Sequence, residues 1–389
     1  MAESNFSQEG EWGRWGSAVG SLRTFWDRYL PSLRKLRDKQ KFRDVSAVGG
    51  SETEEGEEQS LLQRLPMDIQ LYIMAFLRPY DVCQLGCTNR YWNSTVRDPI
   101  LWRYFLLRDL SSWCCVGSSS LPGEEMLTRP LCEFTDSASF DYMSAYLKCG
   151  PACRRRHLKP RQAVHRTVAF LYSLMTSEPR FALFGPGLEQ LDLSLVKKMM
   201  TTPEVLAPAS VPPRQINGIG SGISFLYNNQ HSFNILTLYS TTSKERAKAR
   251  IEQSSTVNKI FMHEDEEGTD GPRPFQYTVI PQVQEVCRVV DGFIYVANAE
   301  PNRRHEQEDE LAQMQALLEL PLGSATRPLL VLSTISTENG GRIPCVYIAH
   351  LLKLSHLKRP WLVQDVTVES LNGLLDGIQW ILEEAGVKT

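Results

Sequence analysis

The sequence predicts a multidomain protein of the α plus α/β class, in which a small all-helical unit precedes an α/β domain. A chain of 389 residues is too long to fold around a single hydrophobic core, which predicts more than one domain. Residues 60–110 repeat apolar side chains at helical spacing, between proline and aspartate residues that favour helix starts. From about residue 161 onward, apolar runs of strand length alternate with helical patterns, which is typical of an open α/β sheet.

Composition and charge favour a folded protein inside the cell. Hydrophobic residues make up 42% and charged residues 22%, which is ordinary for a folded protein. The net charge of −3 does not indicate that the chain as a whole binds nucleic acid. The acidic N-terminus predicts no secretory signal, and no stretch has membrane-spanning length. The nine cysteines are odd in number and scattered, which is typical of proteins whose thiols stay reduced in the cytosol or nucleus. We therefore expect a cytoplasmic location, with the nucleus as an alternative.

A metal site is not predicted. Cys149, Cys153 and His157 are spaced about one helical turn apart, but Pro151 interrupts that helix. No fourth ligand has matching spacing, and structural zinc sites need four.

A basic amphipathic helix is predicted within residues 1–45, from about Val19 to Phe42, with Pro31 as a break or kink. Its apolar positions are Leu22, Phe25, Trp26, Leu30, Leu33 and Leu36. Such a helix can lie on a membrane surface or pack on another helix. Because the chain has no lipidation signal, we favour packing, including self-association as a homodimer.

Residues 46–59 predict an acidic, flexible linker, because the segment is too polar to repay the entropy of ordering it. Ser51 and Thr53 each lie shortly before acidic residues and are candidate phosphorylation sites for an acid-directed kinase. The alternative is that both hydroxyls are simply solvated.

The first helix of the 60–110 unit is predicted to start at Pro66, which suits a first helical turn. Ile69, Ile73, Phe76 and Leu77 then repeat as one face, which we expect to be buried. A unit this small carries more large apolar residues than its own core can hide. The surplus predicts either a partner protein or packing on the following domain.

Three further short helices are predicted. One follows Pro79 and Asp81, and the last begins after Asp98, a favoured N-cap residue. Their apolar residues include Tyr91, Trp92 and Val96 in the third helix and Leu101, Trp102, Phe105 and Leu106 in the fourth.

The spacing of these residues resembles the F-box motif over the whole helical unit. The matching strings are Leu65-Pro66-x-Asp68-Ile69, Ile73-x-x-Phe76-Leu77-x-Pro79-x-Asp81-Val82-x-x-Leu85, Asn89-Arg90-x-Trp92 and Asp98-Pro99-x-Leu101-Trp102. The resemblance implies a non-catalytic subunit of a Skp-cullin-F-box (SCF) ubiquitin ligase, which binds a Skp-type adaptor and through it a cullin and a RING subunit. It further implies that the helices are held together by Trp92, Leu101 and Trp102. The residues that it implies for adaptor binding are Leu65, Pro66, Ile69, Ile73 and Leu77.

Residues 111–160 predict a linker region, and residues 161–389 predict the α/β domain. Near-continuous apolar runs predict central strands that are covered on both faces. The predicted strands are 180–184, 233–239, 292–297, 328–332 and 361–365. The predicted helices are 188–200, 303–320 and 368–384.

The glycine turn after the strand 180–184 lies where a phosphate-binding loop would lie between strand and helix. If Gly185 began such a loop, Gln190 would replace its second glycine, Leu191 its lysine and Asp192 its magnesium-binding hydroxyl. A carboxylate disfavours a triphosphate there, and the compensating lysine is lost. The sequence therefore predicts no cofactor at this turn.

The order of elements nevertheless resembles a small GTPase domain, with 290–296 as its central strand and 361–365 as its last. The guanine-reading Asn-Lys-x-Asp is replaced by Ser333-Thr334-Ile335-Ser336. An F-box joined to such a degenerate GTPase-like domain resembles one particular family of F-box proteins. That resemblance implies substrate recognition for protein degradation, with D-type cyclins and a telomeric repeat-binding factor as substrates, and roles in the cell cycle and telomere maintenance.

A substrate-binding edge strand is predicted at 342–350, because Pro344 cannot donate a ladder hydrogen bond. One face of this strand would present Ile343, Cys345, Tyr347 and Ala349 beside unpaired backbone groups, which a substrate could extend as a further strand. The alternative is that Pro344 merely shields the edge.

Two other functions stay open. An enzyme that hydrolyses GTP through an atypical phosphate loop would bind nucleotide, and a peripheral membrane protein would use its N-terminal helix. No residues can be assigned a catalytic role from the sequence: the seven histidines are dispersed, and Cys287 lies in an apolar run where a buried thiol is inert.

Overall fold

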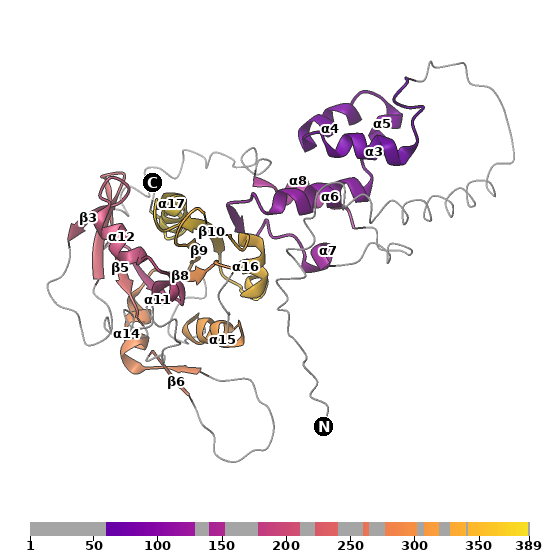
Figure 1. Cartoon of the computed structure of the whole chain (residues 1–389). Helices are drawn as coiled ribbons and strands as arrows, with labels where there is room; N and C mark the ends of the chain where they lie inside the picture. The colour runs from indigo at the N-terminus through magenta and orange to yellow at the C-terminus, as the bar shows by residue number, and fades with distance from the viewer. Residues whose placement is uncertain are drawn as a thin grey trace, which may run out of the picture. The chain divides into compact units, whose positions relative to one another are not determined.

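The structure is a computed structural model of the 389-residue chain. It divides into two compact units, which are described separately: a helical unit, Met1–Ser111 and Pro122–Gly150, and a sheet domain, Ser112–Leu121 and Pro151–Thr389 (Figure 1). The predicted N-terminal helix, the acidic linker, Ser51 and Thr53 lie outside the described residues. The residues that the structure describes are 60–128, 140–151, 178–210, 222–239, 260–263, 277–301, 307–318, 327–339 and 341–387.

The four predicted helices of the 60–110 unit are confirmed. They are α3 (Met67–Ala75), α4 (Pro79–Gly86), α5 (Arg90–Thr95) and α6 (Pro99–Leu110). Two of them begin at side-chain caps: Asn89 Oδ1 accepts from the Trp92 amide at 2.8 Å, and Asp98 Oδ1 accepts from the Ile100 amide at 2.8 Å. These caps satisfy backbone donors that a helix start leaves without a partner.

Helix α6 forms the centre of the helical unit. Leu101, Trp102, Phe105 and Leu106 on it are fully buried, as the sequence predicts. Trp102 Nε1 also donates to the Val96 carbonyl at 2.5 Å, which gives the buried indole a hydrogen-bond partner.

The predicted linker 111–160 is wrong in its described parts, which are elements of both units. Residues 115–117 form a strand of the sheet domain. Helix α8 (Tyr142–Cys149) packs on α6, where the Tyr146 hydroxyl donates to Asp109 Oδ2 at 2.6 Å. The remaining described helix of this segment is α7 (Glu124–Thr128).

The sheet domain is built on one eight-stranded sheet in the order β1-β10-β9-β8-β2-β5-β4-β3. Its strands are β1 (Cys115–Gly117), β2 (Arg180–Phe184), β3 (Ala207–Ser210), β4 (Gly222–Tyr227), β5 (His231–Thr237), β8 (Gly292–Asn298), β9 (Leu329–Ile335) and β10 (Trp361–Thr367). Strands β10, β9, β8, β2 and β5 are parallel neighbours, and β1, β4 and β3 add antiparallel strands. A separate two-stranded sheet pairs β6 (Phe261–His263) with β7 (Tyr277–Val279).

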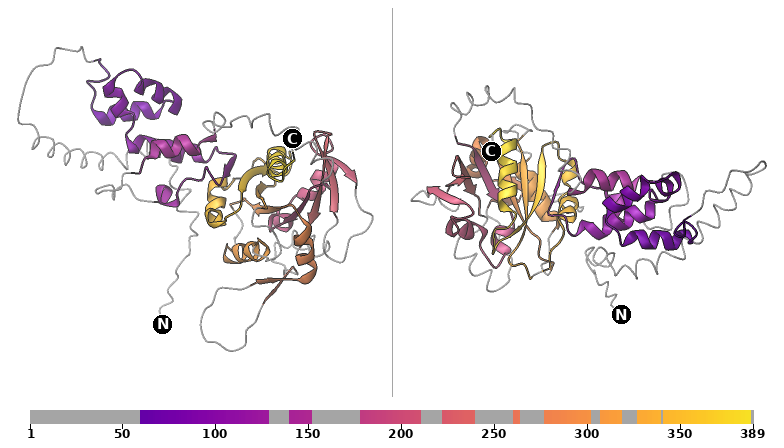
Figure 2. Two further views of the ribbon diagram at one scale, coloured as in Figure 1. Left: turned by 180° about the vertical axis from the view of Figure 1, so that it is seen from behind. Right: turned by 90° about the horizontal axis from the view of Figure 1, so that it is seen from above.

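Helices cover both faces of the central strands (Figure 2). One core contains β-strand residues such as Ile294 and Leu330 together with side chains of three helices. Those helices are α11 (Gly187–Gln190), α12 (Leu195–Thr201) and α17 (Leu374–Glu384). The opposite face is equally buried, as at Tyr295 and Val331. On that side lie α14 (Pro281–Val289), α15 (Gln307–Leu318) and α16 (Cys345–Leu351). Double coverage explains why β8 and β9 are apolar at nearly every position.

Two helices of the sheet domain differ from their predicted ranges, one by an interruption and one by a later start. The predicted helix 188–200 is interrupted between α11 and α12, where Ser194 starts a new helix by accepting from the Lys197 amide at 3.4 Å. The predicted helix 368–384 begins only at Leu374, because Leu371 and Gly373 have positive φ angles that cannot continue a right-handed helix.

The predicted edge strand at 342–350 is wrong, because Cys345–Leu351 is helix α16. Pro344 occupies the N-cap position, where its missing N–H costs nothing, and its carbonyl accepts from the Tyr347 amide at 2.9 Å. A short run that is buried on every side has no periodicity to separate helix from strand. Ile343, Cys345, Tyr347 and Ala349 are all buried and present no free strand edge.

The turn into α17 depends on a glycine. Gly373 has φ +84°, and a Cβ there would lie 2.1 Å from the Asp365 carbonyl oxygen. Gly386 has a similar φ of +91°, but a Cβ there would meet no atom within 4 Å. The two glycines therefore separate the cost of backbone conformation from the cost of a steric clash.

We expect Gly373→Ala to lower the free energy of unfolding by at least about 3 kcal/mol, since a backbone clash adds to the strain of a positive φ. Gly386→Ala, the matched control, has only the conformational cost of about 1–2 kcal/mol. Chemical denaturation of the full chain measures both. Equal losses for the two variants would contradict the packing of Gly373 against β10.

Candidate functional site

Helix α3 is apolar on two sides. Leu71, Met74 and Ala75 point into the helical unit and are only 1% exposed. A second set of apolar side chains is exposed to solvent, with Phe76 64% and Ile69 41% exposed. We call this set the α3 face; its residues are Leu65, Pro66, Ile69, Ile73, Phe76 and Leu77.

The inward side chains fix the orientation of α3, because they pack the helix against α6. The C-terminal end of α3 is tied to α6 as well: Arg108 Nη1 donates to the Ala75 carbonyl at 3.1 Å. Arg108 is itself held by a bidentate contact with Asp109, at 2.6 and 3.0 Å. The α3 face is therefore presented by a helix whose opposite side is part of a core.

The prediction that Ile69, Ile73, Phe76 and Leu77 form a buried face is wrong for the helical unit itself. They share one side of α3, as predicted, but that side is open to solvent. Helical spacing identifies residues that share a face without saying which of two apolar faces turns inward. Trp92, Leu101 and Trp102 are buried, in agreement with their predicted role in holding the helices together.

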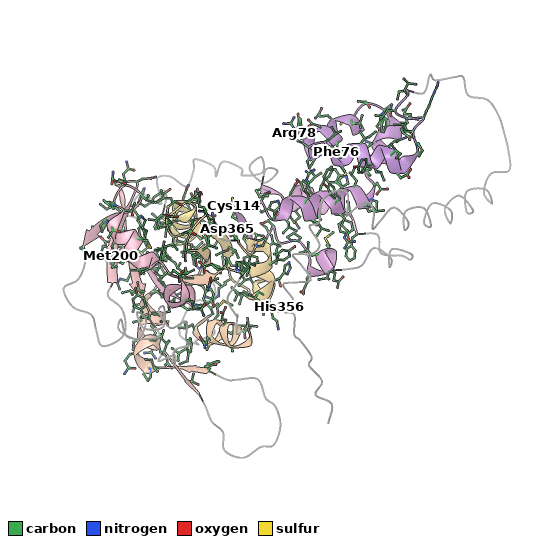
Figure 3. All side chains as sticks on the ribbon, in the orientation of Figure 1. Phe76, Arg78, Cys114, Met200, His356 and Asp365 are labelled. Carbon is green, nitrogen blue, oxygen red and sulfur yellow. The ribbon has the colours of Figure 1, made fainter. Side chains whose placement is uncertain are left out.

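The structure also exposes apolar residues around α3 that the sequence motif did not single out. Tyr80, at the start of α4, is 55% exposed, and Leu61, before α3, is 80% exposed. Phe76 and Arg78, labelled in Figure 3, mark the C-terminal end of α3, where Arg78 forms an exposed ion pair with Asp81 at 2.8 Å. The sequence indicated such residues only in general, because a fifty-residue unit carries more large apolar side chains than its core can bury.

The α3 face has the chemistry of a protein-binding surface. Its six side chains bear no nucleophile, acid or base, so they can bury apolar area but cannot catalyse a reaction. Contiguous exposed apolar residues of this kind mark interaction sites on soluble proteins.

A second candidate site is the carboxyl edge of the parallel strands, between β2 and β8. Along the chain β2 is followed by β5 on one side and later by β8 on the other, and ligands of open α/β sheets bind at such a switch point. Here the glycine turn packs against the sheet itself. A Cβ at Gly185 would lie 2.6 Å from the Val296 carbonyl oxygen, and one at Gly187 would lie 2.9 Å from Thr334 Oγ1.

Side chains at the same edge bind each other and the backbone. Gln190 Oε1, at the position of a second loop glycine, accepts from Asn298 Nδ2 at 3.2 Å. Thr334, in the segment that replaces a guanine-reading motif, donates to the Ala297 carbonyl at 2.6 Å. Leu191 is fully buried where a phosphate-binding lysine would be needed. The glycines of this turn thus serve close packing.

Arg342 joins the carboxyl ends of β9 and β10. Its guanidinium donates to the Ser333 carbonyl at 2.7 Å and to the Val366 carbonyl at 3.0 Å, and it lies 3.3 Å from Asp365 Oδ1. Asp365, labelled in Figure 3, is mostly buried, and its amide donates to the Cys114 carbonyl at 2.8 Å. Burial raises the pKa of Asp365 from 3.8 to about 6, although Arg342 opposes this by favouring the charged form.

Other candidate chemistries find little support in the part of the chain that the structure describes. Within it, no group of three or more His, Cys, Asp or Glu side chains could hold a metal ion. None of its helices is long and apolar enough to cross a membrane. Burial raises the pKa of the Cys287 thiol to about 12, as expected for an inert core cysteine.

Comparisons with known proteins agree with the helical motif. Residues 62–108 match the F-box-like family model. The chain is 53% identical over 375 residues to F-box only protein 4 of Bos taurus, covering 96% of this chain and 94% of the relative. It is 52% identical over 380 residues to F-box only protein 4 of Homo sapiens, covering 97% and 95%, and equally similar to that of Mus musculus.

The raised pKa of Asp365 makes stability depend on pH. The folded state binds the proton of Asp365 more tightly than the unfolded state does. Protonation of Asp365 therefore contributes its full stabilisation of the fold below about pH 4, and this contribution is lost as the pH rises through 6. We expect a loss on the order of 3 kcal/mol across that window. Asp365→Asn should lack this step, which denaturant unfolding of both proteins at several pH values measures. Parallel pH profiles would contradict the assignment.

The packed glycine turn predicts no binding of GTP or GDP at micromolar concentrations in the presence of magnesium. The reasons are the carboxylate of Asp192, the missing lysine and the Gln190–Asn298 contact. Isothermal titration calorimetry with the full chain tests this. Saturable, magnesium-dependent heat would instead support a nucleotide-dependent enzyme.

Proposed function

Because the chain belongs to the F-box only protein 4 family, we propose that it is the substrate-recognition subunit of an SCF ubiquitin ligase. The observation that supports this most directly is the α3 face, an apolar surface exposed on a helix whose other side is buried. The F-box-like match at residues 62–108 covers the helix that bears it. On this proposal the α3 face binds a Skp-type adaptor, which brings the cullin and RING subunits.

The adaptor would bury the side chains that water now contacts. Leu65 and Pro66 lie just before α3, Ile69 and Ile73 lie on it and Leu77 lies just after it, and all five are exposed. Burying apolar area of this kind provides affinity without any titratable group. The chain would therefore be non-catalytic, with ubiquitin transfer performed by the other subunits.

The sheet domain is the proposed substrate-binding part. D-type cyclins and a telomeric repeat-binding factor are the substrates that the family resemblance implies, with roles in the cell cycle and telomere maintenance. The GTPase-like order of its strands and its packed glycine turn suit a scaffold that presents a surface. Ile343, Cys345, Tyr347 and Ala349 are buried, so we assign no substrate contact to them.

Three further parts of the proposal rest on sequence alone. We propose action in the cytoplasm, with the nucleus as an alternative, because the scattered cysteines suit a compartment in which thiols stay reduced. Self-association through the helix predicted within residues 1–45 stays a prediction, as does phosphorylation of Ser51 and Thr53.

We expect replacement of Leu65 and Pro66 by Ala to weaken binding of a purified Skp-type adaptor by at least about tenfold, since one or two buried anchors are worth over about 1.4 kcal/mol. Leu193→Ala is the matched control, because Leu193 is 39% exposed in the sheet domain and Leu65 is 37% exposed. Biolayer interferometry with the full chain measures both affinities.

The control variant should bind the adaptor as the unchanged protein does. An unchanged affinity of the Leu65/Pro66 variant, with circular dichroism showing that it is folded, would remove the α3 face as the adaptor surface. The isolated chain should also show no ubiquitin transfer when it is mixed with charged ubiquitin-conjugating enzyme alone.

A further inference from the structure

The segment that carries Leu65 and Pro66 is weakly held by the rest of the helical unit. Leu61, Leu65 and Pro66 are exposed, and among the apolar residues of the segment Leu62 is partly buried, so little apolar area anchors it. Ser60 and Gln63 form hydrogen bonds with each other, at 3.0 and 3.4 Å, which shape a turn but do not attach it to α3. A segment so placed needs another contact to fix its direction.

The start of α3 does not provide that contact through a cap. Pro66 is the N-cap residue of α3, and its side chain makes no capping hydrogen bond. The backbone bonds across this point, from the Ile69 and Gln70 amides to the Pro66 carbonyl, belong to the first helical turn itself. They fix Pro66 on the helix and leave the residues before it undirected.

A buried amide attaches the segment to the helix. Gln70 lies on α3 and is 1% exposed. Its Nε2 donates to the Leu65 carbonyl at 2.8 Å and to the Gln63 carbonyl at 3.2 Å. Its Oε1 accepts from the Tyr91 hydroxyl of α5 at 2.8 Å.

The orientation of this amide follows from its partners. Both carbonyls can only accept, so the NH₂ group must face the segment and the oxygen must face Tyr91. Both donors are used and the acceptor is occupied, which is how a buried amide avoids a desolvation penalty. An apolar side chain of the same volume could fill this position but could not form these hydrogen bonds. What the amide of Gln70 adds is therefore its contact with the two carbonyls.

We propose that Gln70 is a positioning residue, which holds Leu65 in the conformation that the adaptor binds. The inference rests on the proposed function and goes beyond it, because Gln70 is buried and is not itself a residue of the α3 face. Fixing the segment before binding lowers the entropy lost on association. Gln70 therefore strengthens adaptor binding through the geometry of Leu65.

Gln70→Met tests this proposal in the full chain, because methionine is similarly long and unbranched and forms helices about as well. We expect binding to the purified Skp-type adaptor to weaken by about tenfold through lost preorganisation. In the free protein, hydrogen exchange should accelerate at the Gln63 and Leu65 amides. Exchange within α6 should not change.

A double-mutant cycle separates positioning from a general effect on the fold. In a Leu65→Ala background, Gln70→Met should weaken adaptor binding by less than about twofold, since the side chain that Gln70 positions is gone. In a Phe76→Ala background the full loss of about tenfold should persist, because Phe76 lies at the far end of α3.

Each other outcome has a definite meaning. An undiminished loss in the Leu65→Ala background, unchanged binding by Gln70→Met, or faster exchange within α6 would overturn the positioning role. If Leu65→Ala and Phe76→Ala weaken binding while Gln70→Met does not, only the positioning role fails. If none of the three variants changes adaptor affinity, the proposed function fails.

Discussion

The helical unit depends on one constraint, which is that α3 is apolar on two opposite sides while the unit can bury only one. Leu71 and Met74 complete the core against α6, and Ile69 and Ile73 are left in water. One core buries one apolar face of a helix, and a second, exposed apolar face marks an interaction surface. The unit is therefore incomplete by itself, and binding a partner is the simplest way in which its second face becomes buried.

The sheet domain shows the opposite arrangement, in which the edge that binds ligands in open α/β sheets is closed by the chain itself. Arg342 uses its donors on the carbonyls of Ser333 and Val366, and Gln190 pairs with Asn298. Groups that could have bound a ligand instead satisfy buried polar atoms of the sheet. Among the described residues, this edge of the sheet is therefore occupied by contacts of the chain with itself.

Sequence reasoning succeeded where a segment has an unambiguous local signal. The apolar runs at β8 and β9 are bounded by glycine and proline, and Asp98-Pro99 marks the start of α6. It failed where tertiary packing decides. The buried residues of α16 lack any periodicity, and the side of α3 that faces inward depends on contacts with α6 that no local pattern encodes. Gln70 was missed because a polar residue in a mostly apolar helix predicts no particular partner.

The two units are interleaved along the chain, and this limits what a deletion can show. Residues 112–121 contribute β1 to the sheet domain, and the chain then returns to the helical unit through Pro122–Gly150. A segment cut at residue 110 would keep the F-box motif but lose α8, whose Tyr146 bonds Asp109 and packs near Trp102. Removing the motif would likewise leave α8 without α6. Single substitutions on the α3 face therefore separate adaptor binding from folding in a way that excision of the motif cannot.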